Sequence, residues 1–304
     1  MKRILVTGAS GFVGQALVEH LAASGYAVRA ASRKALPPRT GVESVPAPDL
    51  AGNPDWAPLL DGVDAVIHAA AIAHTSGINE ALYDAVNHRA VLSLAQAAQG
   101  RIERLVFLSS VRAQCGATAP GVLTEADAPA PRDAYGRSKL AAELGLRRMQ
   151  ARAVILRPVL VVGPDAGGNL ATMLRLARLN LPFRLDGLTA KRSLVARDDL
   201  CRAVVHALGD TVAIGDTYLV AHPAAVGVGE MFAGLREGMC HKPGPVNIPS
   251  PLLRGLATLP GLGSRREQLF GDLVVSPAKL IATGFAPQTM PLAAMAKMAA
   301  QSLR

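Results

Sequence analysis

Two side chains that could move a proton lie one helical turn apart near the middle of the chain. Tyr135 and Lys139 are four residues apart in a segment, 134–149, whose apolar spacing predicts a helix, so they share one face of it. A phenol, with a pKa of about 10, is a poor proton shuttle at neutral pH, but a neighbouring ammonium stabilises the phenolate. The pair is therefore a candidate acid/base unit. The same spacing also occurs on exposed helices without function, so its surroundings must support this reading.

Serine hydroxyls just before that helix supply such support. Residues 104–110 (RLVFLSS) form an apolar run that predicts a buried strand ending in Ser109 and Ser110, and either hydroxyl could reach the same substrate alcohol. We take Ser110 as the candidate and keep Ser109 as the alternative. Residues 111–132 are rich in glycine and proline and predict a long loop, and such loops in compact domains are usually functional.

A glycine-rich turn near the N-terminus predicts a phosphate site. Gly8, Gly11 and Gly14 follow an apolar strand, 2–7, and precede a helical pattern, 12–23, which leads to a second strand, 26–32. Glycines at these places allow a tight turn and close backbone approach to a phosphate, and the helix N-terminus adds amides and a positive dipole. The predicted ligand is a dinucleotide pyrophosphate. The positive nicotinamide ring of such a ligand would further stabilise a Tyr135 phenolate.

The end of the second strand bears on the choice of dinucleotide. Folds of this kind that prefer NAD place an acidic residue there for the ribose hydroxyls, whereas a nearby arginine accommodates the 2′-phosphate of NADP. Here the acidic position is Ser32, with Arg33 and Lys34 beside it. We therefore expect NAD or NADP, with a preference for NADP. Alternatively, both bases are ordinary surface residues.

The composition narrows the remaining classes of function. The 304 residues are 50% hydrophobic with a net charge of +9, so the chain can bury a large core. Basic residues are scattered and aromatics make up only 4%, which argues against nucleic-acid binding. Three widely spaced cysteines and the absence of an HExxH pattern argue against a disulfide framework or a metal site. With no leader segment and no apolar run of spanning length, we expect a cytoplasmic protein.

The order of elements predicts an α/β fold, a Rossmann-like doubly wound parallel sheet with a smaller, interleaved C-terminal lobe. The expected strands are 2–7, 26–32, 42–46, 64–70, 104–110 and 217–220, and the expected helices are 12–23, 81–98, 134–149, 170–179, 198–208 and 265–270. We expect residues 1–165, joined by 196–222, to bind the dinucleotide. Residues 166–195 and 223–304 would form the substrate lobe. The apolar stretch 251–262 could touch a membrane or partner, but packing within the lobe is the simpler expectation.

Five ordered motifs together resemble the extended short-chain dehydrogenase/reductases over nearly the whole chain. They are TGASGFVG near the N-terminus, HAA at 68–70, VFLSS at 106–110, YGRSK at 135–139 and RPVLVVGP at 157–164. Within that superfamily the chain is most similar to the nucleotide-sugar epimerase/dehydratase branch, in particular the UDP-sugar 4-epimerases and 4-keto reductases. The resemblance implies an NAD(P)-dependent enzyme acting on a sugar nucleotide.

The resemblance also implies roles for individual residues. Tyr135 would be the acid/base, Lys139 would lower its pKa and hold the nicotinamide ribose, and Ser110 would bind the reacting oxygen. Asn169 and Arg192 would hold the sugar nucleotide, with the Arg192 guanidinium on the diphosphate. The expected cofactor-binding residues are Gly8, Gly11, Phe12, Val13, Gly14, Ser32, Arg33, Asp49, Leu50, Ala69, Ala70, Ala71, Asn87, Tyr135, Lys139 and Pro158.

Departures from the family pattern limit the reaction. Sugar-nucleotide dehydratases have Asp-Glu directly after the catalytic hydroxyl, where this chain has Val111 and Arg112, so dehydration is not expected. Cys115 stands where the family often has tyrosine. Near the C-terminus the family's Val-Asp is Val275-Ser276, which leaves the far end of the substrate site open.

Several functions remain open. A 4-epimerase returns the hydride to the other face of the sugar, whereas an NADPH-dependent reductase of a UDP-4-keto-6-deoxy sugar delivers it once; we place the epimerase first. VRAASRK at 28–34 is also similar to NADPH-dependent reductases of plant-phenolic type, which act on unphosphorylated ketones or aldehydes. A cofactor-sensing regulator would typically lack the Tyr/Lys pair. A homodimer is possible through helices covering 90–98 and 140–146.

Overall fold

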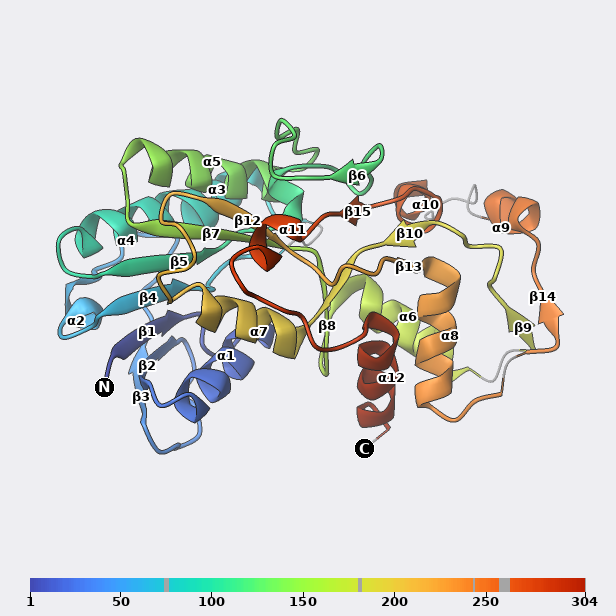
Figure 1. Ribbon diagram of the computed structural model, residues 1–304, viewed down its shortest axis with the longest axis horizontal. Coiled ribbons are helices and arrows are strands. Elements are labelled where there is room, and N and C mark those ends of the chain that lie inside the picture. Colours follow the sequence, from blue (N-terminus) through green and yellow to red (C-terminus); the bar gives the residue numbers. More distant parts are fainter. Residues whose placement is uncertain (74–76, 180–181, 243, 257–262, 304) are drawn as a thin grey trace.

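One parallel sheet forms the core of the larger part of the molecule, on the left in Figure 1. The computed structural model describes residues 1–73, 77–179, 182–242, 244–256 and 263–303. The seven strands lie in the order β12-β7-β5-β4-β1-β2-β3, and each is parallel to its neighbours. They are β1 (Arg3–Thr7), β2 (Ala27–Ser32), β3 (Val42–Pro46), β4 (Ala65–His68), β5 (Arg104–Leu108), β7 (Ala153–Pro158) and β12 (Thr217–Val220). The predicted doubly wound sheet is confirmed. Its strand order reverses between β1 and β4, the place where such sheets bind ligands.

Helices cover both faces of this sheet, which explains why β1 is apolar on both of its sides. The helices of one face are α1 (Phe12–Ala23), α7 (Arg197–His206) and α11 (Ala278–Ile281). The helices of the other face are α2 (Ala57–Leu60), α3 (Glu80–Asp84), α4 (Ala90–Ala98) and α5 (Ala134–Arg148). Ile4, Leu5 and Val6 of β1 are each at most 1% exposed. Side chains on both sides of a strand are apolar when both faces of the sheet are covered.

A smaller group of helices and short strands lies beyond one end of the sheet (Figure 1). Its helices are α6 (Gly168–Arg178), α8 (Val228–Gly238), α9 (Ser250–Leu256), α10 (Gly263–Phe270) and α12 (Pro291–Gln301). Its strands are β8 (Leu160–Val162), β9 (Phe183–Arg184), β10 (Lys191–Arg192), β11 (Leu194–Ala196), β13 (Val226–Gly227), β14 (Val246–Asn247) and β15 (Val274–Val275). Helices α6, α8 and α12 pack around a core that includes Phe232, Leu235 and Met295. This group of elements therefore has a hydrophobic core of its own.

Three segments differ in detail from the sequence-based expectation. The helix expected over 81–98 is divided into α3 and α4 by a π-helical turn, Ala85–Arg89. The loop expected over 111–132 contains a 3-10 turn, Val111–Ala113, and a short strand, β6 (Val122–Leu123), which pairs with β15. Within the apolar stretch 251–262, the structure places 251–256 in α9, and residues 257–262 lie outside the described part. Along the described chain, no helix combines the length and apolarity needed to span a bilayer.

Candidate active site

The glycine turn between β1 and α1 has no room for side chains at two of its glycines. Gly8 has a φ of 71°, and a Cβ there would lie 2.7 Å from backbone atoms of Ala70. A Cβ on Gly14 would lie 2.0 Å from the Gly8 carbonyl oxygen, so α1 could not approach the turn as closely. The Gly11 amide closes the turn on the same oxygen at 2.9 Å. This bare backbone and the free first-turn amides of α1 fit a pyrophosphate.

Other expected cofactor residues lie at the same edge of the sheet. Phe12 and Val13 begin α1, and the alanines at 69–71 follow β4, the strand beside β1. The Ala69 amide donates to the Thr7 carbonyl at 3.2 Å, and the Ala70 amide donates to the Thr7 hydroxyl at 3.4 Å. Pro158 ends β7 at the same edge of the sheet. Sheets of this kind bind ligands in a crevice outside the carboxyl ends of their strands, and we use the crevice as the name for that position beside the ends of β1 and β4.

The carboxyl end of β2 bears no carboxylate. Ser32 is buried, and its hydroxyl bonds to the backbone of Lys34, accepting the amide at 3.2 Å and donating to the carbonyl. Arg33 is exposed beside it. Asp49 is exposed and accepts the Ala51 amide at 3.0 Å, while Leu50 packs against the core beneath. A positive side chain is therefore available at this position, and nothing acidic at Ser32 would repel a 2′-phosphate.

The predicted acid/base pair lies on the inner face of α5. The Tyr135 hydroxyl is hydrogen-bonded to Ser110, and burial raises the pKa of Tyr135 to about 12 despite the lowering effect of that bond. The Lys139 ammonium donates to the Leu108 carbonyl at 2.8 Å and lies 4.7 Å from the centre of the Phe107 ring. Burial lowers the pKa of Lys139 to about 7. The protein alone therefore does not hold Tyr135 as a phenolate, because desolvation opposes either charge.

The geometry separates the two candidate serines. Ser110 follows β5 and points its hydroxyl at Tyr135. Ser109 points elsewhere and donates to the Glu143 carboxylate at 2.5 Å, in the buried interior. Only Ser110 is therefore positioned beside the acid/base pair.

Asn87 joins the chain after β4 to α5. Its amide side chain accepts the Ile72 amide at 2.8 Å and donates to the Ile72 carbonyl at 3.0 Å. It also donates to the Ser138 hydroxyl at 3.2 Å, which in turn donates to the Tyr135 carbonyl at 2.8 Å. Asn87 lies in the π-helical turn that interrupts the expected helix. Such turns are frequent at functional sites, and this one places a polar side chain between the chain after β4 and α5.

The start of α5 is fastened to the segment that carries Ser110. Asp133 caps the helix by accepting the Gly136 amide at 2.7 Å, and its other oxygen accepts two N–H groups of Arg112. A Cβ on Gly136 would lie 2.2 Å from the Arg112 carbonyl oxygen. Glycine directly after Tyr135 therefore permits a close approach that fixes Tyr135 against Ser110.

The two residues expected to hold the sugar nucleotide meet at α10. Arg192 donates to the Ala117 carbonyl at 2.6 Å and to the Glu267 and Gln268 carbonyls at 3.1 and 2.5 Å. Asn169 donates to the Gln268 side chain at 2.6 Å. The structure thus brings Arg192 and Asn169 to one place. In this state the Arg192 guanidinium binds backbone carbonyls, so a phosphate there would have to displace α10.

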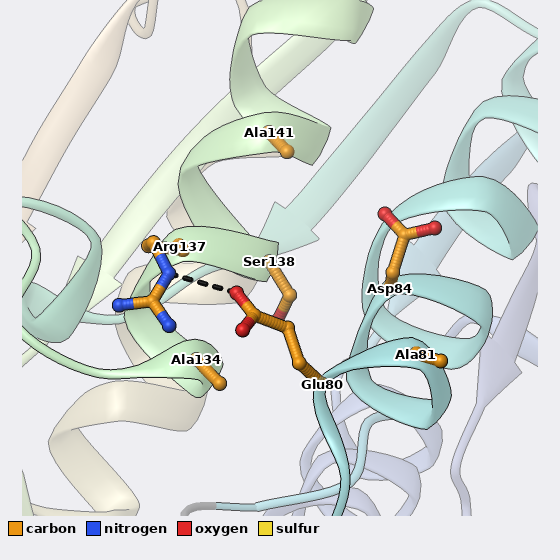
Figure 2. A pocket seen from close by; sticks show the side chains of 7 residues that line it. All are labelled: Glu80, Ala81, Asp84, Ala134, Arg137, Ser138 and Ala141. Carbon is orange, nitrogen blue, oxygen red and sulfur yellow. Dashed lines mark hydrogen bonds and ion pairs between the residues drawn. The ribbon is translucent and has the colours of Figure 1, made fainter.

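A separate hollow of about 260 Å³ lies on the outer side of the catalytic helix, between α3 and α5 (Figure 2). Glu80 and Arg137 form an ion pair of 2.9 Å across it. Its lining on α5 is Ala134, Arg137, Ser138 and Ala141, a face turned away from the one that carries Lys139. The hollow is therefore distinct from the crevice.

A buried polar group beneath the site was not predicted from the sequence. Glu143 pairs with Arg157 of β7 at 2.5 Å, both side chains being at most 3% exposed, and Arg157 also donates to Gln114 at 2.8 Å. Glu143 follows Lys139 by four residues, among the buried Ala142 and Leu146. A lone acid on the apolar face of a predicted helix was the signal that could have revealed it.

Comparison with known proteins identifies the family of the chain. Residues 4–221 match the model of the NAD dependent epimerase/dehydratase family. The chain is 31% identical over 286 residues to a UDP-glucose 4-epimerase of Vibrio cholerae, covering 90% of this chain and 87% of that one. It is 34% identical over 226 residues to a dTDP-6-deoxy-L-talose 4-dehydrogenase (NAD(P)(+)) of Kitasatospora kifunensis, covering 68% and 70%.

A solved structure shares the fold along the entire length. MoeE5 in complex with UDP-glucuronic acid and NAD is 24% identical, with a TM-score of 0.79 over 99% of both chains. The family match extends over the glycine turn, Ser110, Tyr135 and Lys139. The chain belongs to the NAD dependent epimerase/dehydratase family and is an NAD(P)-dependent enzyme of the extended short-chain dehydrogenase/reductase type.

Proposed function

We propose that the protein is an NAD(P)-dependent nucleotide-sugar 4-epimerase that acts on a UDP-hexose or UDP-N-acetylhexosamine through a 4-keto intermediate. The observation that carries the proposal is the Ser110–Tyr135 hydroxyl pair, with Lys139 on the same helix face, in a fold whose glycine turn fits a dinucleotide pyrophosphate. The 31% identical Vibrio relative supports the same reaction class.

In this proposal Tyr135 takes the proton of the C4 hydroxyl while Ser110 holds its oxygen. The glycine turn at Gly8, Gly11 and Gly14 would hold the dinucleotide, whose nicotinamide would supply the acceptor for the C4 hydride and its return to the opposite face of the sugar. Tyr135 is a neutral phenol in the protein alone, and Lys139 has a pKa of about 7, so each charged form is costly by itself. A phenolate and an ammonium side by side stabilise one another, so the pair is able to ionise together when the oxidised nicotinamide adds its positive charge.

The proposed substrate lobe comprises residues 166–195 and 223–304, and the dinucleotide would bind to 1–165 and 196–222. Arg192 and Asn169 would hold the diphosphate and sugar at the boundary between these parts. A guanidinium binds phosphate oxygens with two donors, so exchange of carbonyl contacts for a diphosphate at Arg192 would be favourable. We therefore expect α10 to shift when substrate binds.

The test is incubation of purified protein with UDP-GlcNAc and with UDP-glucose, without added cofactor, followed by analysis of the sugar. A C4 epimer and NAD retained in the protein are expected. Tyr135→Phe should abolish turnover because the ring remains while the proton carrier is lost. Tyr26→Phe removes a phenol remote from the crevice and serves as the matched control. Full activity of Tyr135→Phe would refute the site.

A second candidate is an NADPH-dependent reductase of a UDP-4-keto-6-deoxy sugar. The observation that favours it is the carboxyl end of β2, where Ser32 takes the acidic position and Arg33 is exposed. The Kitasatospora relative is named a 4-dehydrogenase, which denotes the same oxidation–reduction at C4 of a 6-deoxy sugar nucleotide, written in the oxidative direction. Absence of turnover in the first test, with NADPH bound far more tightly than NADH, would favour the reductase.

A further inference from the structure

One short segment of chain contacts both halves of the proposed site. At its beginning, Ser110 is hydrogen-bonded to Tyr135. Seven residues later, the Ala117 carbonyl accepts from Arg192 at 2.6 Å. The conformation of residues 110–117 therefore sets the separation between the acid/base pair and the guanidinium proposed to hold the diphosphate.

The middle of that segment is anchored by Gln114, which is 1% exposed. Its side-chain oxygen accepts from Arg157 at 2.8 Å. Its side-chain nitrogen donates to the Thr124 and Asp127 carbonyls, at 2.5 and 3.0 Å. Among side-chain groups, only a neutral carboxamide combines an oxygen that accepts from a guanidinium with an NH2 group that donates to two carbonyls.

The same chain of contacts leads back to the catalytic helix. Arg157 binds the Glu143 carboxylate with two N–H groups, at 2.9 and 2.5 Å. Glu143 also accepts from Ser109, the neighbour of Ser110, at 2.5 Å, and it lies one helical turn after Lys139. Buried polar networks of this kind, when every member is satisfied, fix one arrangement of the parts that they join.

The far side of the segment is joined to the substrate lobe. Beyond Gln114, the Ala119 amide donates to the Asp272 carbonyl at 2.9 Å, and β6 pairs with β15. The Gln114 carbonyl itself accepts the Ala130 amide at 2.8 Å, near the start of α5. Gln114 is thus the point at which α5, β7 and the loop that reaches the substrate lobe are held together.

We propose that Gln114 is a positioning residue that fixes the spacing between the Ser110–Tyr135 pair and the diphosphate site at Arg192. The inference rests on the proposed function for the identity of that diphosphate. It predicts that loss of Gln114 slows the chemical step while each half of the site still binds its own part of the ligand.

The test compares Gln114→Met, which keeps the length of the side chain, with Gln96→Met, the same change at an exposed position of α4. With the nucleotide sugar that the wild type converts, kcat of Gln114→Met should fall at least about tenfold, because small misplacements of reacting groups are costly. Affinity for UDP, measured by calorimetry, and retained cofactor should match the wild type. Amide hydrogen exchange across 116–131 should become roughly tenfold faster, since the loop loses its buried anchor.

A second variant separates the two ends of the side chain. Gln114→Glu keeps an acceptor for Arg157 but has no donor for the loop carbonyls, so exchange across 116–131 should again be faster. Unchanged kcat in Gln114→Met, or equal losses of kcat, UDP affinity and cofactor, would overturn the proposal. If the wild type converts no nucleotide sugar, the proposed function fails, and unchanged exchange in both variants would then separately overturn the role of Gln114.

Discussion

The charge state of Lys139 gives a stability test that does not depend on the substrate. The pKa of its buried ammonium is lowered from 10.5 to about 7, so the folded protein releases this proton before the unfolded chain does. Between these pH values the unfolded state binds more protons, and the folded state gains stability as pH rises, by about 1.4 kcal/mol per unit at most. Lys139 is half protonated at pH 7, so the gain between pH 7 and pH 9 is roughly 2 kcal/mol.

The assay is urea unfolding of the cofactor-free wild type and of Lys139→Met at both pH values. Burial also raises the pKa of Cys115 and Cys201, which lowers stability above about pH 9. Both proteins carry these thiols, so their contribution cancels when the two unfolding free energies are subtracted. The unfolding free energy of the wild type minus that of Lys139→Met should be roughly 2 kcal/mol larger at pH 9 than at pH 7. The same substitution at exposed Lys297 is the control. A difference that is independent of pH would refute the burial of an easily deprotonated lysine at this position.

Three further predictions concern the other parts of the site. Ser110→Ala should lower kcat about 100-fold at little cost in stability. Ser109→Ala should instead lower the unfolding free energy by about 1–3 kcal/mol, because the buried Glu143 carboxylate loses a donor. The reverse pattern would exchange the roles of the two serines. Gly14→Ala should release the cofactor, assayed after denaturation, and destabilise by roughly 1–3 kcal/mol because its Cβ has no space; full cofactor content would contradict this. Arg33→Ala should weaken NADPH binding roughly tenfold in fluorescence titration and leave NADH unchanged; equal effects on both would remove its assignment to the 2′-phosphate.

The sequence predicted those parts of the site that depend on local spacing. Gly8, Gly11 and Gly14 follow a strand directly, and Tyr135 and Lys139 share a helix face because they are four residues apart. The parallel sheet followed from buried strands alternating with helices. Each of these inferences needs only a short window of sequence, and the structure bears out the strand, turn and helix at each place.

Features that depend on contacts between residues distant in the sequence could not be predicted from it. Ser109 and Ser110 are adjacent and chemically equal, and only the position of Glu143, thirty-four residues further on, turns one of them inward. Arg192 bonds to the backbone of Gln268 across seventy-six residues, a contact that no local pattern encodes. The pKa of Tyr135 was expected to be lowered by Lys139, but burial of the phenol raises it. That balance depends on tertiary packing.

The most direct test of the proposed reaction follows the hydrogen at C4. Purified protein with its retained cofactor is incubated with the UDP-sugar substrate labelled with deuterium at C4, in ordinary water, and in parallel with unlabelled substrate in heavy water. A hydride that leaves and returns within one active site keeps its label, so we predict an epimer with full deuterium in the first case and none at C4 in the second. Loss of label, or solvent deuterium at C4, would contradict the 4-keto mechanism at Tyr135.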